Sequence, residues 1–324
     1  MIVDCAVYEH GHRRPGRHSL EDAYTATRGT DAFVWVGVHE PTQEEFENVR
    51  HAFSLHELAV EDAIKAHQRP KLELYDDSLF IVLKPVAYHD REESLEFGEI
   101  QLFVGANFVV SVRHGKPGNL REARHRIEAR PDLLNCGPSA VVYGILDKVV
   151  DEYREVVTSL EEDVQQVETQ VFSQSGPSSA ERIYRLRREV LEFHTATAPF
   201  AEPIERLVRR RVPFIHEEIT DYFRDVYDHL VLVVQQAAGF RELLANAMDV
   251  HLSSTSTRLN ATMKQLTVVA SLFLPLTFIT GFFGMNFGYL VSRIGGPETF
   301  AAAVALMLLS VAVQVMYYRR QGVI

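Results

Sequence analysis

LTVVASLFLPLTFITGFF, residues 266–283, is the stretch that decides the architecture of this 324-residue chain. A second apolar stretch, FAAAVALMLLSVAVQVMYY, covers residues 300–318. Neither contains Asp, Glu, Lys, Arg or His, and each is close to the roughly 20 residues that a helix needs to cross a hydrocarbon core. Because backbone groups in lipid must hydrogen-bond internally, both are expected to be spanning helices. The sequence therefore predicts a protein that crosses the bilayer twice, with most of its mass on one side.

The charges beside the two spans predict their orientation. Lys264 precedes the first span and Arg319 and Arg320 follow the second, whereas the connection holds Arg293, offset by Glu298. Lys and Arg are in excess on the cytoplasmic side of membrane proteins. Both termini are therefore expected in the cytoplasm and the protein in the plasma (inner) membrane. The acidic N-terminus has no signal-peptide pattern.

The net charge of −11 argues against a nucleic-acid partner and fits a protein that handles cations. Cys5 and Cys136 are too few and too far apart in the sequence for a disulfide framework or a thiolate metal site. In a cytoplasmic domain they are expected to be reduced and structural.

The chain before the spans predicts an α/β domain followed by long helices. Strand-like runs rich in Val, Ile and Phe cover residues 3–8, 33–38, 80–88, 95–104 and 108–113. A capping pattern from Thr42 and an amphipathic run at 55–66 predict helices between them. We expect these divisions: a cytoplasmic α/β domain (1–135), a helical hairpin (136–212), a cytoplasmic stalk helix (213–265), the first span (266–287), an external loop (288–298), the second span (299–318) and a basic cytoplasmic tail (319–324).

The predicted hairpin has an acidic arm, residues 139–172, and a basic arm, residues 180–211. SQSGPSS at 173–179 is a turn by composition. We expect the arms to pair through weak ion pairs on solvated faces, and Pro199 and Pro203 to bend or interrupt the basic arm.

After Pro213 no strong helix breaker occurs before Pro275, so residues 217–286 are predicted to form one nearly continuous helix. About 70 residues make a rod of roughly 105 Å. Such a rod cannot bury an amphipathic face against this chain alone, so we expect a homo-oligomer around an axis.

One face of that helix carries a stripe at steps of three and four residues, close to the period of a coiled-coil seam. Small or weakly polar side chains in the stripe allow close helix approach in lipid. The stripe is either the lining of a pore or simple helix packing without a hole. Its members are Asn260, Met263, Leu266, Ala270, Leu274, Thr277 and Gly281.

Other candidate sites are weaker. His216-Glu217-Glu218 lacks the second His of a zinc-protease motif and is interpreted as a solvated helix start. Glu9 with His10, His12 and His18 can hold a metal ion, but a mobile loop is the favoured interpretation. No nucleophile-and-base constellation and no nucleotide-binding loop occurs, so an enzyme is not predicted.

Three segments carry a family resemblance, in the same order along the chain: EDAIKAHQRPK at 61–71, YFRDVYDH at 222–229 and MKQLTVVASLFLPLTFITGFFGMNF at 263–287. With two C-terminal spans, the tripeptide Gly284-Met285-Asn286 and a basic C-terminus, the chain resembles the CorA family of magnesium transporters. The resemblance implies a funnel-shaped homopentameric channel for Mg²⁺, with Co²⁺ or Ni²⁺ also possible, driven by the electrochemical gradient.

The resemblance also implies roles for individual residues. Gly284, Met285 and Asn286 are expected to form the selectivity filter, and the stripe positions other than Ala270 fall where the family lines its pore. Mg²⁺ gives up its waters reluctantly, so neutral oxygens of Asn286, Thr277 and Gly281 suit the hydrated ion. For Asn286 alone, a helix cap is the simpler interpretation. Met263 and Leu266 are expected to form apolar collars that gate by dewetting, with core packing as the alternative.

The sequence departs from the family at two places. Phe283 precedes the tripeptide where Tyr is usual, and the loop GYLVSRIGGPE at 288–298 lacks the acidic residues common there. A zinc-transporting branch usually changes the middle residue of the tripeptide, so Met285 favours the magnesium branch. The alternatives are a Zn²⁺-transporting relative and a membrane-anchored metal sensor that does not conduct.

A regulatory metal site is also implied by the resemblance. The Asp at the position of Asp225 faces a carboxylate of the neighbouring subunit in this family, and a divalent ion bridges the two. Asp90, or His89 beside it, is the best partner in this chain. High cytoplasmic Mg²⁺ is then expected to hold the subunits in a closed state.

Overall fold

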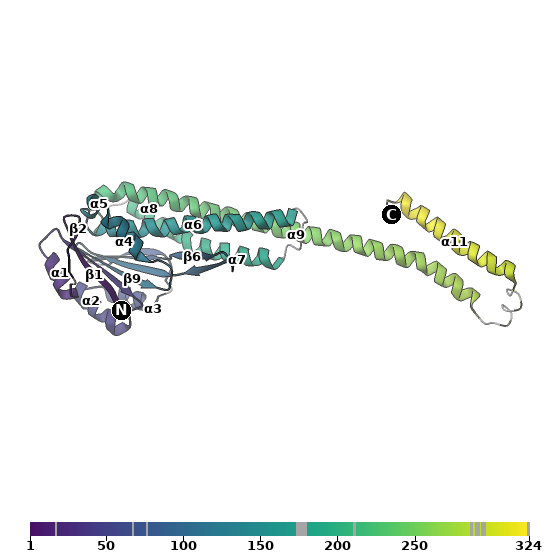
Figure 1. Ribbon diagram of the computed structural model, residues 1–324, viewed down its shortest axis with the longest axis horizontal. Helices are drawn as coiled ribbons and strands as arrows, with labels where there is room; N and C mark the ends of the chain where they lie inside the picture. Colours follow the sequence, from purple (N-terminus) through teal and green to yellow (C-terminus); the bar gives the residue numbers. More distant parts are fainter. Residues whose placement is uncertain are drawn as a thin grey trace. The chain divides into compact units, whose positions relative to one another are not determined.

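The computed structural model describes residues 1–16, 18–66, 68–75, 77–172, 180–209, 212–285, 288, 292 and 296–322. The chain forms two compact units, Met1–Met248 and Asp249–Ile324. The predicted division points at 135 and 212 lie inside the first unit, and that at 265 lies inside the second. The predicted α/β N-terminal domain, long helix and two apolar C-terminal helices are all present (Figure 1).

A seven-stranded sheet organises the first unit, in the order β2-β1-β3-β9-β8-β5-β4. Strands β3 and β9 pair in parallel, and all the other neighbouring strands of this sheet pair antiparallel. Its strands are β1 (Ile2–Glu9), β2 (His12–Arg13), β3 (Phe33–His39), β4 (Lys71–Tyr75), β5 (Ser78–Leu83), β8 (Glu99–Val104) and β9 (Phe108–His114). Runs such as FVWVGVH in β3 are buried on both faces, which is why they read as continuous hydrophobic stretches.

Helices cover both faces of this sheet (Figure 1). On one face lie α1 (Leu20–Thr27), α2 (Gln43–Phe53) and α3 (Glu57–Lys65), whose apolar sides share a core with the strands. Thr42 and Glu45 form the predicted capping box at the start of α2. On the other face lie α4 (Leu120–Glu128), α5 (Pro131–Leu134) and α6 (Pro138–Phe172). The sheet is therefore the middle layer of three.

The two longest predicted strands are each split in the structure. Residues 80–88 divide into β5 and β6 (Val86–His89), and residues 95–104 divide into β7 (Ser94–Phe97) and β8. The breaks meet at one corner, where the Gly98 N–H donates to the Pro85 carbonyl at 2.9 Å. Pro85 has no N–H to continue the ladder. The strands β6 and β7 consequently pair with each other in a separate two-stranded sheet.

The basic arm of the predicted hairpin is interrupted where its prolines predict. It comprises α7 (Ala180–Thr197), a 3-10 turn η1 (Ala198–Phe200) and α8 (Ala201–Arg209). The expected pairing of the two arms by charge is only partly right. Arg182 contacts Asp163 of α6 at 3.5 Å, but Arg182 and Arg185 both bind Glu93, between β6 and β7, at 2.7 and 2.8 Å. The basic arm is thus tied to the small sheet as well as to α6.

A 3-10 turn η2 (Glu217–Ile219) leads into α9 (Thr220–Phe283), which continues through Pro275 as one helix of 64 residues. In the second unit, α11 (Pro297–Arg320) runs back alongside the last part of α9 (Figure 1). The hydroxyls of Ser271 and Tyr318 are 2.6 Å apart, and Lys264 donates to the Gly322 carbonyl at 3.3 Å. Both helices are long and apolar enough to cross a membrane.

Candidate functional site

The predicted pore-lining stripe lies on one side of α9 that α11 leaves uncovered. Met263, Leu266 and Leu274 are 65%, 68% and 73% exposed. The remaining members, Asn260, Ala270, Thr277 and Gly281, are exposed as well. By contrast, Val268, Ser271, Leu272, Pro275 and Ile279 are buried or partly buried. The stripe therefore remains available to line a pore or to meet another copy of the chain.

Within the apolar stretch, the stripe offers a hydrogen-bond acceptor at Thr277. The Thr277 hydroxyl donates its hydrogen to the Phe273 carbonyl at 2.9 Å, which satisfies the donor within the helix and leaves oxygen lone pairs free to accept. Nothing lies within 4 Å of the position that a Cβ would take at Gly281. Since the water molecules around a hydrated cation are donors, this face can accept hydrogen bonds from such an ion.

The predicted filter follows the end of α9. The Gly284 N–H donates to the Thr280 carbonyl at 2.9 Å, and the Met285 N–H donates to the Phe282 carbonyl at 3.3 Å. Two helix-like hydrogen bonds therefore continue past the last residue of α9. Asn286 lies outside the described residues, so its role in the filter stays a prediction.

Asp225 and Asp90 have different surroundings in the single chain. Asp225 is exposed on α9, 3.7 Å from His229, and adds negative potential at Asp147 of α6. Asp90 is exposed just after β6, whose last residue, His89, contacts Glu96 at 3.0 Å. The predicted bridge, between Asp225 and Asp90 or His89 of a neighbouring subunit, stays a prediction.

Burial raises the pKa of Asp147 first, and Asp151 raises it further, while Arg126 opposes both. Asp225 contributes to the same rise in the pKa of Asp147. Asp225 of α9 and Asp147 of α6 are therefore close enough for their charges to interact.

Glu9, His10, His12 and His18, for which a metal site was the less favoured interpretation, do not form a metal-binding cluster among the described residues. Glu9 forms an ion pair with Arg14 at 2.7 Å, and the His12 ring contacts the carbonyl of His10 at 2.9 Å. Within the described part of the chain, three metal-binding side chains come together in one place, and they are different ones: Cys136, His216 and Glu218.

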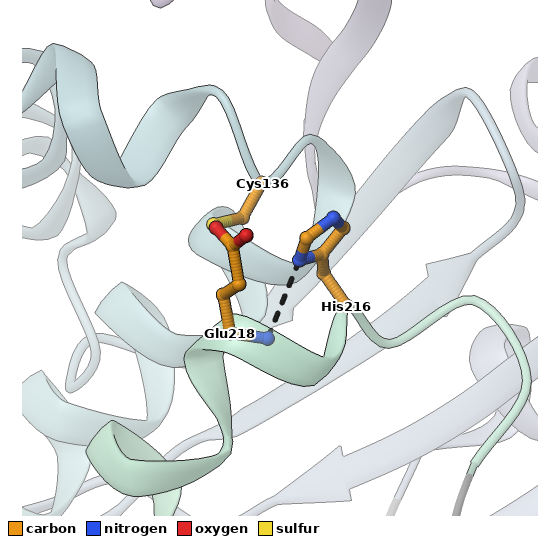
Figure 2. Close-up of side chains that lie close together, drawn as sticks. All are labelled: Cys136, His216 and Glu218. Carbon is orange, nitrogen blue, oxygen red and sulfur yellow. Dashed lines mark hydrogen bonds between the residues drawn. The ribbon is translucent and has the colours of Figure 1, made fainter.

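In this cluster one ligand atom from each side chain lies within 4.8 Å of the others (Figure 2). His216 begins the helix, as predicted: its Nδ1 accepts from the Glu218 N–H at 3.4 Å, at the start of η2. Cys136, between α5 and α6, is 9% exposed. Burial raises the pKa of its thiol, and Glu218 and then Asp132 raise it further. The sequence shows the His and Glu as a pair, but nothing in it connects them to Cys136.

Comparison with known proteins places the chain in a family. The model of the CorA-like Mg²⁺ transporter proteins matches residues 30–320. The cobalt/magnesium transport protein CorA of Thermotoga maritima is 29% identical, over 91% of this chain and 84% of that protein. The putative metal ion transporter YfjQ of Bacillus subtilis is 31% identical, over 90% of each chain.

The fold agrees with this assignment. The complete structure of the CorA magnesium transporter from Methanocaldococcus jannaschii superposes with a TM-score of 0.78, covering 100% of both chains at 22% identity. The family model covers nearly the whole chain, from the sheet to the last apolar helix. This chain therefore belongs to the family of CorA-like Mg²⁺ transporter proteins.

Proposed function

We propose that this protein is a channel-type transporter that carries Mg²⁺, and also Co²⁺ or Ni²⁺, across the plasma (inner) membrane as a homopentamer. Family membership supports the transport of divalent cations, and two relatives are described as metal ion or cobalt/magnesium transport proteins. The single observation that carries the proposal is the uncovered stripe of α9, whose last member, Gly281, precedes the Gly284-Met285-Asn286 tripeptide in the sequence.

The stripe suits a hydrated divalent ion. Mg²⁺ keeps its inner waters, so it is best recognised through neutral acceptors that bind those waters. Thr277 offers such an oxygen, and in this proposal a ring of Asn286 side chains offers a second set at the outer mouth. The two apolar stretches contain no ionisable residue, which disfavours a proton relay as the coupling mechanism.

The driving force in this proposal is the electrochemical gradient. The membrane potential contributes about 4.6 kcal/mol per 100 mV for a divalent cation, because each elementary charge contributes about 2.3 kcal/mol. In this proposal Lys264, Arg319 and Arg320 lie on the cytoplasmic side of the membrane. An inside-negative membrane potential draws cations toward that side.

Regulation is assigned to Asp225, with Asp90 or His89 of the adjacent subunit as its partner. Carboxylates that face each other repel when the site is empty and attract when a divalent ion lies between them. The charge interaction between Asp225 and Asp147, which puts two carboxylates near each other on this face, supports such a role. High cytoplasmic Mg²⁺ would therefore close the channel by joining neighbouring subunits.

The proposal is tested by Mg²⁺ flux into liposomes that contain the purified full-length protein and a Mg²⁺-sensitive dye, with an inside-negative potential. Wild-type protein should take up Mg²⁺, and Asn286→Ala should lose uptake while remaining a pentamer. Asn246→Ala, an exposed asparagine of α9 outside the stripe, is the matched control and should transport normally. Wild-type flux in a pentameric Asn286→Ala protein would remove the filter assignment, and absence of any flux would leave the metal-sensor alternative.

A further inference from the structure

Two segments that are distant in the sequence meet where α9 begins. Cys136 comes from the connection between α5 and α6, and His216 and Glu218 come from the entry into η2. Figure 2 shows the three side chains converging, and one sulfur, nitrogen or oxygen atom from each lies within 4.8 Å of the others. A thiol, an imidazole and a carboxylate therefore share one small volume.

Hydrogen bonds hold the two segments in this arrangement. The buried Ser139 hydroxyl accepts from the His216 N–H at 2.8 Å and donates to the Phe214 carbonyl at 3.3 Å. On the other segment, the Cys136 N–H donates to the Leu133 carbonyl at 2.8 Å. Gly137 follows with φ +67°, a conformation that favours glycine, and lets the chain turn into α6. These hydrogen bonds thus fix the backbone positions from which the Cys136 and His216 side chains extend.

The donor set selects a particular class of ion. Sulfur, nitrogen and oxygen donors together suit a borderline divalent ion such as Zn²⁺, whereas Mg²⁺ requires oxygen ligands in near-octahedral geometry. A thiolate and a carboxylate also balance the charge of a divalent ion. Zinc bonds of about 2.0–2.3 Å place tetrahedral ligands about 3.5 Å apart, so the cluster needs to close by roughly 1 Å. The exposed side chains of His216 and Glu218 can make that movement.

Binding would disturb little of the existing structure. The capping hydrogen bond between the Glu218 N–H and His216 Nδ1 is long, at 3.4 Å, so its loss costs little. A cavity of about 680 Å³ has Cys136 and His216 on its wall, which gives an ion access and leaves room for a water molecule as the fourth ligand.

We propose that Cys136, His216 and Glu218 bind Zn²⁺ and that the ion ties the start of α9 to the connection between α5 and α6. Because α9 is the helix that carries the stripe, occupancy of this site would fix the cytoplasmic start of that helix. The inference does not depend on transport. It concerns a site different in place and in ligand chemistry from the carboxylates Asp225 and Asp90.

Co²⁺ absorption provides the test, because a thiolate ligand gives an intense near-ultraviolet charge-transfer band that oxygen ligands do not. The full-length protein, without a histidine tag, is reduced, freed of metal and titrated with Co²⁺ in detergent. A large excess of Mg²⁺ occupies sites made only of oxygen. Wild-type protein should develop the band with one Co²⁺ per chain, and added Zn²⁺ should abolish it.

Variants identify the ligands. Cys136→Ser should lose the band, whereas Cys5→Ser, which changes the other free cysteine, should keep it. His216→Gln and Glu218→Gln should each weaken Co²⁺ binding by about 10-fold or more, since even the loss of an outer-shell partner has an effect of about that size. Melting of each variant without metal controls for folding. Absence of the band in wild-type protein, its survival in Cys136→Ser, or its loss in Cys5→Ser would each overturn the proposal, whatever the outcome of the flux assay.

Discussion

Glu152 of α6 is a partly buried carboxylate. One of its oxygens contacts Lys148 at 3.3 Å, and the other has no hydrogen-bond partner among the described residues. Burial raises the pKa of Glu152, and Lys148 opposes that rise without cancelling it. The folded protein therefore binds a proton at Glu152 more tightly than the unfolded chain does.

Stability should fall as the pH rises through the titration of Glu152. Its contribution is fully present below the unfolded pKa of about 4.3 and is lost as the pH passes the raised folded pKa. Glu152→Gln should remove this part of the pH dependence, because the amide has no charge to bury. Thermal melting of the detergent-solubilised protein across this range measures the difference. Glu162→Gln, exposed on the same helix, should melt as wild type does; equal pH slopes for wild type and Glu152→Gln would contradict the assignment.

At the scale of elements, α4 and α6 cross closely because α6 has a glycine at the contact. A Cβ at Gly144 would lie 2.2 Å from Cγ1 of Ile127, which is buried on α4. No ordinary contact is that short, so a larger residue would force the two helices apart. The crossing carries α4 against the face of the sheet that α6 covers.

Gly144→Ala should destabilise the protein by about 1–3 kcal/mol through this overpacking. The matched control is Gly239→Ala, in the interior of α9, where nothing lies within 4 Å of the added methyl. That control should stabilise by about 0.5–1 kcal/mol, as alanine does in a helix interior. Thermal melting compares the stability of the two variants. Gly144→Ala should lower stability less in an Ile127→Ala background, where the side chain that it would clash with is smaller. If Gly144→Ala lowers stability equally in both backgrounds, the close approach of Gly144 to Ile127 is not the cause of that loss.

Met263 and Leu266 are the apolar members of the stripe nearest the N-terminal start of the first span. As collars they would exclude water, so Met263→Ser or Leu266→Asp should raise ion leak by wetting the constriction. Single-channel recording in planar bilayers measures the change. Leu259→Ser, an exposed apolar residue of α9 outside the stripe, should leave conductance as it is. Unchanged conductance in both collar variants would favour simple helix packing.

At the scale of the whole molecule, the second unit exposes more apolar surface than one chain can cover. Leu274, Phe278 and Phe300 are at least 73% exposed. Lipid or further copies of the chain must cover these side chains, since burial of apolar surface is favourable by about 25 cal/mol per Å². Membrane insertion and the proposed homopentamer both satisfy this requirement.

The regulatory proposal also belongs to this scale, because it needs two subunits. Asp225→Ala and Asp225→Lys should both shift the Mg²⁺-dependent protection of the first unit against protease to higher Mg²⁺, by about 10-fold or more, since one bridging ligand is lost. Asp221→Ala, which removes an exposed ion pair with Arg224, serves as the control. Protection with the wild-type Mg²⁺ dependence in both Asp225 variants would show that the ion is sensed elsewhere.

Local sequence determined most of the helices and the family. The apolar stretches at 266–283 and 300–318, the long periodic runs of α6 and α9, and the capping box at Thr42 each depend on neighbouring residues. Such signals act within a turn or a strand and can be read without knowing the fold. The tripeptide at 284–286 with two spans was sufficient to indicate the family that the comparisons then showed.

Tertiary structure decided what depends on residues distant in the chain. The corner between Pro85 and Gly98 splits two predicted strands, because each break is stabilised by the other. Packing of α11 on the Val268 side of α9 leaves the stripe uncovered, and periodicity alone cannot say which face a neighbour takes. Cys136 meets His216 and Glu218 only because Ser139 anchors the entry to α9 against the start of α6. Contacts of this kind are set by how the layers pack and leave no mark in the local sequence.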